Sequence, residues 1–293
     1  MTVSTLGMAA RPHAAFPYAI AMALLLPIVI VNAVGFASPV LYLVQMSVNT
    51  FVSGGGIRPD ITAENYAAIL TDVFYLELLG RSIIFSLTVT AITLILSYPI
   101  ALFIHRARPH WRTFLTIMAI SPLLLSAVIR TYGWILVLGD QGMINSALMA
   151  LGIVKVPVRL ANNLTGATIG LVEILMPYMI LALQAGFGRL DQTYEEAARS
   201  LGATPRTNFV RIVLPLTMPG IALGTLLCFV LAISSFITPK LLGGGRVVLL
   251  ATEIFDQAMM LLNWPLAAAL SVLILTVFAA ALALYARATR SFA

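Results

Sequence analysis

The chain has 293 residues, of which 60% are hydrophobic and 10% charged, and its mean hydropathy is +1.00. Soluble domains are about 45–50% apolar, so this composition excludes a soluble protein and indicates an integral membrane protein. The formal net charge of +6 does not indicate a nucleic-acid partner, because the arginines lie in short clusters between apolar runs. The single cysteine, Cys228, lies inside an apolar run, which excludes an internal disulfide and a thiolate metal site.

Six apolar runs are long enough to cross a bilayer, which takes about 20 residues in a helix. They recur almost evenly, so we interpret residues 17–288 as one six-span, all-α membrane domain that follows a short tail, residues 1–16. The first run is about twice the length of a signal-peptide core and is expected to be retained. The runs are 17–46, 80–104, 113–138, 164–187, 212–237 and 264–287.

The distribution of basic residues predicts the orientation. If the N-terminus is cytoplasmic, ten Lys and Arg residues lie in cytoplasmic segments and five in outer loops. The positive-inside rule therefore favours cytoplasmic positions for both termini and for the loop 189–211.

Two charged residues fall inside predicted spans, Arg130 in the third and Glu173 in the fourth. A charge facing lipid costs at least about 2.5–3.5 kcal/mol, so both are expected to face protein or a water-filled path. Three interpretations are open: a structural salt bridge between the two, a role in lining a translocation path, or separate partners. Tyr132 and Trp134 accompany Arg130, either as interfacial anchors or as rings that hold ammonium groups by cation–π contact.

The loop 189–211 is unusual in this chain, because it holds seven charges within 23 positions. Thr193 and Glu196 have the spacing of a capping box, and Gly202 supplies a C-terminal stop. A short helix is therefore predicted over 194–201.

A second helix is predicted to follow at once, because Thr204 can cap it and Pro205 suits its first position. It is expected to run into the fifth span, where Pro215 and Pro219 predict bending. The loop is then a helix, a sharp turn and a second helix. Two interpretations are open: it docks on another protein, or it is a solvated connector whose charges set topology.

The spacing of this loop resembles the EAA signature of permease subunits of binding-protein-dependent ABC importers at every defined position: Glu196-Ala197-Ala198, three residues, Gly202, nine residues, Ile212, one residue, Leu214-Pro215. In that family the segment forms a coupling helix that seats in a groove of a separate ATPase subunit. The resemblance therefore implies an ATPase contact made by Tyr194, Glu195, Glu196, Ala197, Ala198, Leu201, Gly202 and Ala203.

Two further stretches narrow the resemblance. "IRTYGWILVLGDQGMINSAL", residues 129–148, is similar to the third span and following loop of spermidine/putrescine-type permeases. "SSFITPKLLGGG", residues 234–245, resembles the end of the fifth span in the first of the two paired permeases of that group. An apolar stretch, 147–156, follows the third span, and is expected either to lie as an amphipathic helix where a binding protein docks or to pack as a loop.

The resemblance implies a type I ABC importer permease fold in the bacterial cytoplasmic (inner) membrane. Its implied partners are a second, related permease subunit, two ATPase subunits and a periplasmic solute-binding protein. ATP and Mg²⁺ are expected on the ATPase and no cofactor on this chain, since no Gly-x-x-x-x-Gly-Lys-Ser/Thr element occurs in it.

The predicted function is import of a small charged or zwitterionic solute, of the polyamine, opine-like or amino-acid-derived kind. Glu173 would suit a cationic solute, whereas Arg130 argues the other way. The main alternative is an ion-gradient-driven secondary transporter, in which an EAA-type loop would have no role. An enzyme is not expected, because all three histidines lie in cytoplasmic segments or at their edge.

Overall fold

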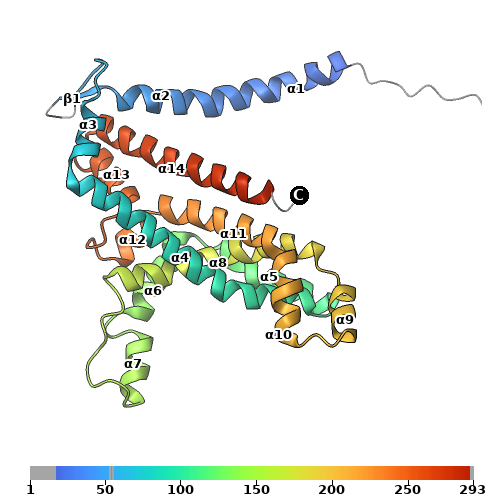
Figure 1. The fold of residues 1–293 in the computed structure, drawn as a ribbon. Coiled ribbons are helices and arrows are strands. Elements are labelled where there is room, and N and C mark those ends of the chain that lie inside the picture. Colours follow the sequence, from blue (N-terminus) through green and yellow to red (C-terminus); the bar gives the residue numbers. More distant parts are fainter. Residues whose placement is uncertain (1–17, 53, 55, 291–293) are drawn as a thin grey trace, which may run out of the picture. The chain divides into compact units, whose positions relative to one another are not determined.

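The computed structural model describes residues 18–52, 54 and 56–290 (Figure 1). The chain divides into two units, Met1–Gln45 and Met46–Ala293, each described by itself. The tail predicted for residues 1–16 lies outside the described residues.

The first unit consists of a long apolar helical segment. It contains α1 (Tyr18–Asn32), a π-helical turn η1 (Ala33–Ala37) and most of α2 (Ser38–Ser47). Pro39 lies two residues beyond the end of the π turn; because proline has no N–H to continue the ladder, a widened turn just before it is a common accommodation. The stretch Leu25–Ser47 is apolar enough to cross a membrane, as predicted for the first span.

The second unit begins with a small antiparallel hairpin and is otherwise helical. In the hairpin Phe51 pairs with Ile57, and Ser47 and Tyr66 form a hydrogen bond of 2.6 Å between the segments on either side. Four apolar helical segments match predicted spans in position, and each is long enough to cross a membrane. The elements are β1 (Thr50–Val52), β2 (Gly56–Arg58), α3 (Glu64–Thr71), α4 (Val73–Arg106), α8 (Leu164–Gly186), α10 (Pro205–Asn208) continuing through the π turn η4 (Phe209–Val213) into α11 (Leu214–Ser234), and α14 (Trp264–Arg290).

The third predicted span, 113–138, is broken and is not one continuous helix. The segment 109–124 meets the segment 127–150 at 94°, and the described residues contain five spanning helices, or six with this bent pair. The reason is local: Pro122 cannot continue an α-helix ladder, and the Ser126 hydroxyl caps a new helix by accepting from the Val128 N–H. The elements here are α5 (Pro109–Ile120), the 3₁₀ turn η2 (Ser121–Leu124), α6 (Ala127–Leu138) and α7 (Met143–Ala150).

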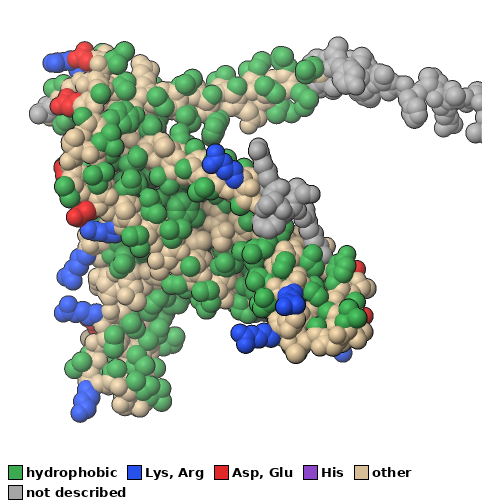
Figure 2. Space-filling model, in the orientation of Figure 1, with side chains coloured by type: hydrophobic (Ala, Val, Ile, Leu, Met, Phe, Trp, Pro, Cys, Tyr) green, Lys and Arg blue, Asp and Glu red, His purple; other side chains and the backbone are tan. Residues whose placement is uncertain are grey.

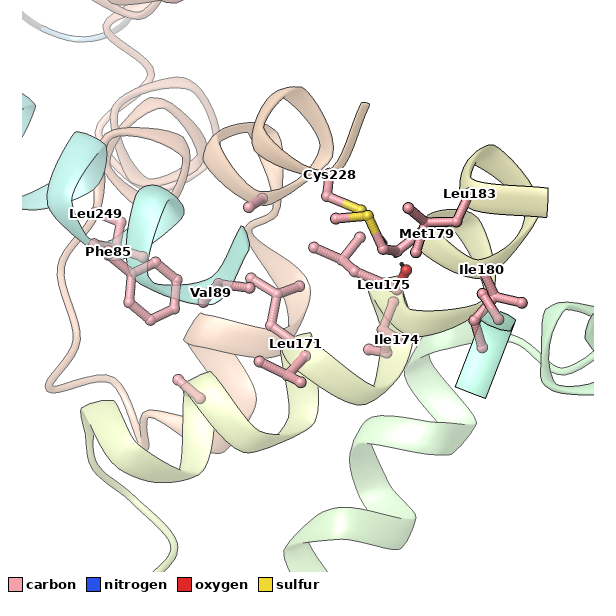
Figure 3. Close-up of a cluster of buried hydrophobic side chains, with 14 of the residues drawn as sticks. Phe85, Val89, Leu171, Ile174, Leu175, Met179, Ile180, Leu183, Cys228 and Leu249 are labelled. Atoms are coloured by element: carbon pink, nitrogen blue, oxygen red, sulfur yellow. Dashed lines mark hydrogen bonds between the residues drawn. The ribbon is translucent and has the colours of Figure 1, made fainter. Parts of the chain in front are cut away.

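The core of the second unit lies where α4, α8 and α11 pack together (Figure 3). Leu171, Met179 and Leu183 of α8 are fully buried against Val89 of α4 and Cys228 of α11. Cys228 is thus a core side chain, as predicted. Burial of each large apolar side chain stabilises the fold by about 1.5–3 kcal/mol in water, whereas between helices in lipid the gain comes from packing.

Two glycines bring α8 and α11 into backbone contact. A Cβ on Gly220 would lie 2.8 Å from the Cα of Gly186, which no side chain tolerates. Small residues at such crossings are how membrane helices approach closely.

The two ends of the second unit carry different elements (Figure 1). α9 (Gln192–Ser200) and α10 lie at one end, and α12 (Ile237–Leu242) and α13 (Leu250–Met259) lie at the other. In the orientation predicted from the basic residues, the α9 end is cytoplasmic and the α12 end is the outer one.

Candidate functional site

The predicted short helix of the loop is α9, and it begins two residues earlier than expected. The Asp191 carboxylate accepts from the Thr193 N–H at 3.0 Å, so Asp191 is the N-cap. The predicted capping box of Thr193 with Glu196 is therefore wrong. Aspartate is as good an N-cap as threonine, and the argument from sequence spacing did not consider Asp191 as the cap.

The end of α9 is as predicted. Gly202 has φ +83°, the Gly202 N–H donates to the Arg199 carbonyl at 2.9 Å, and the Ala203 N–H donates to the Ala198 carbonyl at 3.0 Å. This is a Schellman ending, in which glycine takes the left-handed position without a Cβ penalty. The chain reverses there, and Thr204 caps α10 by accepting from the Thr207 N–H at 3.3 Å.

The EAA-like residues do not share one face of α9. Glu195 and Ala198 are buried, with exposures of 6% and 7%. Their neighbours Tyr194, Glu196 and Ala197 are exposed, as is Leu201, whose 89% exposure is unusual for a leucine. Of the residues predicted to contact an ATPase, Glu195 and Ala198 therefore face the protein's own interior, and Ala203 is half-buried. The exposed ones form an open surface, which we call the α9 outer face: Tyr194, Glu196, Ala197, Leu201 and Gly202.

Glu195 fastens α9 to two other segments. Its carboxylate accepts two hydrogen bonds from the Arg106 guanidinium, at 2.8 and 3.1 Å, and one from the Asn208 side chain at 3.0 Å. Arg199, one turn along, lies 3.8 Å away. Arg106 ends α4 and Asn208 ends α10, so this carboxylate joins α9 to two spans. We call Glu195, Arg106 and Asn208 the clamp.

An aromatic cluster lies close to the clamp residues along the chain. Tyr98 of α4 meets Phe187 and Phe209 edge to face, with centroids 5.7 and 5.8 Å apart, and its hydroxyl bonds to the Thr217 hydroxyl at 3.0 Å. His105 bonds to the Leu190 carbonyl at 3.3 Å. Such edge-to-face pairs contribute about 0.5–1.5 kcal/mol beyond area burial, so they help to hold α4, Phe187 and the π turn η4 together beside the clamp.

The two charges predicted inside the membrane meet. Arg130 of α6 and Glu173 of α8 form a salt bridge of 3.4 Å, and the Trp134 indole N–H donates to the other carboxylate oxygen at 3.3 Å. The Arg130 side chain is 9% exposed and the Glu173 side chain 30%. Tyr132 does not join them: it is exposed and outside the cavity that they line.

This cavity has a volume of about 230 Å³ and is lined by Arg130, Gly133, Trp134, Val137 and Glu173. The hydrogen bonds to Glu173 are long, and the Nε of Arg130 has no partner among the described residues although it is buried. The carboxylate therefore retains capacity to accept from a further donor, beside an indole that attracts cations. No group of three or more His, Cys, Asp and Glu side chains with metal-binding geometry occurs among the described residues.

Comparison with known proteins agrees with these features. Residues 106–291 match the family model described as "Binding-protein-dependent transport system inner membrane component". The chain is 36% identical, over 78% of its length and 80% of the relative's, to the spermidine/putrescine transport system permease protein PotB of Haemophilus influenzae. It is 34% identical to PotB of Escherichia coli, over 86% and 91% of the two chains.

Solved structures share the fold. A bacterial ABC transporter that imports the acidic polysaccharide alginate superposes with a TM-score of 0.70 at 19% identity, over 92% of this chain and 95% of that one. The MetNI methionine ABC transporter, in an inward-facing conformation, superposes with a TM-score of 0.55 at 16% identity, over 76% and 100%.

Proposed function

Since the chain belongs to the family of binding-protein-dependent transport system inner membrane components, it is an inner-membrane permease of an ATP-driven importer and not an ion-gradient-driven transporter, and we propose that it imports a polyamine. The family is a transport family, so the chain is not an enzyme. ATP hydrolysis by separate subunits is part of the proposal.

The proposed ATPase contact is the α9 outer face. The exposed face of α9 presents Tyr194, Ala197 and Leu201, whereas its opposite face is bonded to two spans. This arrangement suits a helix that contacts a partner on one side and transmits the partner's movement to the spans on the other. Movement of α9 would reach α4 through Arg106 and α10 through Asn208. The family resemblance adds the rest of this proposal, which is two ATPase subunits that hold ATP and Mg²⁺.

The other proposed partners are a second, related permease subunit and a periplasmic binding protein. The binding protein follows from the family description, and the alginate importer has been solved with a solute-bound periplasmic protein. We propose a second permease because residues of α6 and α8 alone line the Glu173 cavity, and a translocation path needs further walls.

The substrate class rests on one observation, the under-coordinated Glu173 carboxylate beside Trp134. A primary ammonium of a polyamine would find there a carboxylate and an aromatic face, which together offset part of its lost hydration. Arg130 would neutralise Glu173 while no solute is present. The two relatives named as spermidine/putrescine permeases favour the same class.

The experiment is uptake of labelled spermidine and putrescine by cells that carry the complete transporter. We expect Glu173→Gln to raise the apparent KM about tenfold, because a charged partner of the ammonium is lost while its shape is kept. The glutamine keeps an acceptor oxygen for Arg130, so the variant complex should still assemble, with a modest loss of thermal stability because the buried arginine loses its counter-charge. Absence of polyamine uptake by the wild type would contradict the substrate class, and a stability loss with unchanged KM would reduce Glu173 to a structural role.

A further inference from the structure

A second cavity, of about 630 Å³, lies at the end of the second unit opposite α9. It is lined by three arginines from three different segments: Arg81 from α4, Arg159 from the loop before α8, and Arg246 from the turn after α12. With Asp140 as the one acidic side chain in its lining, the cavity has a formal excess of two positive charges. Figure 2 shows basic side chains along the left edge of the view, the end at which α6, α7 and α12 lie.

The three arginines lack the partners that comparable residues have. Arg58 pairs with Asp60 at 3.7 Å, and Lys240 pairs with Asp256 at 2.6 Å. Within the described part of the chain, Arg81, Arg159 and Arg246 form no ion pair, and all three are exposed. Like charges that converge on one cavity repel each other, so an anion that enters is stabilised by all three.

The walls of the cavity are held by specific bonds. Asn162, at φ 59°, donates its N–H to the Leu242 carbonyl at 2.8 Å and packs against Gly244, where a Cβ would lie 2.7 Å from its side-chain oxygen. Asn163 accepts from the Gly166 N–H at 2.8 Å and so caps α8. The loops that carry Arg159 and Arg246 are therefore tied together, so the backbone positions of these two arginines are fixed relative to each other.

The first turn of α8 adds to the attraction for anions. Asn163 and Leu164 at its start line the cavity, and a 23-residue helix presents partial positive charge at this end. A polyamine would be repelled here, so the cavity does not suit the free solute of the proposed transport path.

We propose that the Arg81, Arg159 and Arg246 cavity receives acidic side chains of the periplasmic binding protein, and that these contacts dock it on this permease. The inference rests on the proposed function, which assigns a binding protein, and on the orientation predicted from the basic residues, which places this end outside. Three arginines from separate segments match several carboxylates on one protein surface, since each guanidinium can bind a carboxylate through two hydrogen bonds.

The test uses the complete transporter in nanodiscs, with the ATPase rate measured against the concentration of solute-loaded binding protein. In the triple variant Arg81→Gln, Arg159→Gln, Arg246→Gln, the concentration of binding protein that gives half of the maximal ATPase rate should rise about tenfold, and the maximal ATPase rate should not change. The tenfold rise is the cumulative effect of losing three exposed ion pairs. Added salt should weaken docking for the wild type and much less for the triple variant, because the Debye length falls to about 8 Å at physiological ionic strength.

Arg58→Gln is the matched control, because Arg58 is an exposed arginine outside this cavity that already has a partner; its half-maximal concentration should equal that of the wild type. An unchanged triple variant would overturn the inference. So would an effect of the triple variant that depends on anionic phosphatidylglycerol in the nanodisc, since the occupant would then be a lipid headgroup. If no binding protein stimulates the wild type, the proposed function itself fails.

Discussion

Glu195 and Glu173 are both carboxylates paired with an arginine, but they differ in how completely they are bonded. Glu195, with a 7% exposed side chain, accepts three hydrogen bonds of 2.8–3.1 Å. Glu173, with 30% exposed, accepts two of 3.3–3.4 Å beside a cavity. A fully bonded buried carboxylate holds segments together, whereas a partly bonded one at a cavity can accept a new donor. The same residue type therefore serves structure in one place and suits ligand exchange in the other.

Removal of the Glu195 carboxylate should have the largest effect. Glu195→Ala leaves Asn208 and Arg106 without their acceptor; hydrogen bonds to charged groups contribute about 1.5–3 kcal/mol, and we take about 2 because Arg106 is 44% exposed. We expect uptake to fall more than tenfold and protease cleavage within 189–211 to increase. Glu196→Ala, on the exposed face, should leave cleavage at the wild-type level; equal cleavage in both variants would contradict the clamp.

A change at the end of α9 should have a smaller effect, and it separates the clamp from the contact face. Gly202→Leu forces a branched side chain into φ +83°, which costs about 1–2 kcal/mol, and it adds bulk where a partner approaches. We expect ATPase activity to persist while uptake per ATP falls several-fold. Gly202→Asn should be milder, because asparagine tolerates this conformation. Normal uptake by the Gly202→Leu variant would contradict the proposal that α9 is the coupling helix.

The smallest expected effect is that of replacing Trp134, which donates a hydrogen bond to Glu173. Trp134→Leu removes one hydrogen bond and an aromatic face, together about 1 kcal/mol, so the apparent KM for spermidine should rise about fivefold. Tyr132→Leu is its matched control, because Tyr132 lies outside the cavity, and it should stay within about twofold of wild type. Similar KM values for the two variants would argue against a solute site at Glu173.

Local patterns were enough to predict most of the elements. The apolar runs located five spans, and the Gly202 and Thr204 signals predicted the turn between α9 and α10. These features depend on residues within one or two turns of each other. The break at Pro122 was missed because high apolar content over 113–138 outweighed a single proline in the hydropathy argument.

Contacts between distant residues were not predictable in the same way. Arg106 and Glu195 are 89 positions apart, so nothing in the local spacing showed that this arginine is more than a topology charge. Arg130 and Glu173, 43 positions apart, were considered as a pair only because charges are rare inside spans. The Arg81, Arg159 and Arg246 cavity had no such signal, because one arginine in α4 and one in each of two separate loops are unremarkable when each is taken by itself.

The central claim is that the α9 outer face contacts the ATPase, and photo-crosslinking tests it most directly. A benzophenone amino acid in place of Leu201, which is 89% exposed beside α9, is compared with the same amino acid in place of Leu151, which is 74% exposed at the end of α7. In the assembled transporter, position 201 should form an adduct with the ATPase subunit and position 151 should not. Absence of an ATPase adduct at 201, or equal adducts at both positions, would contradict the account.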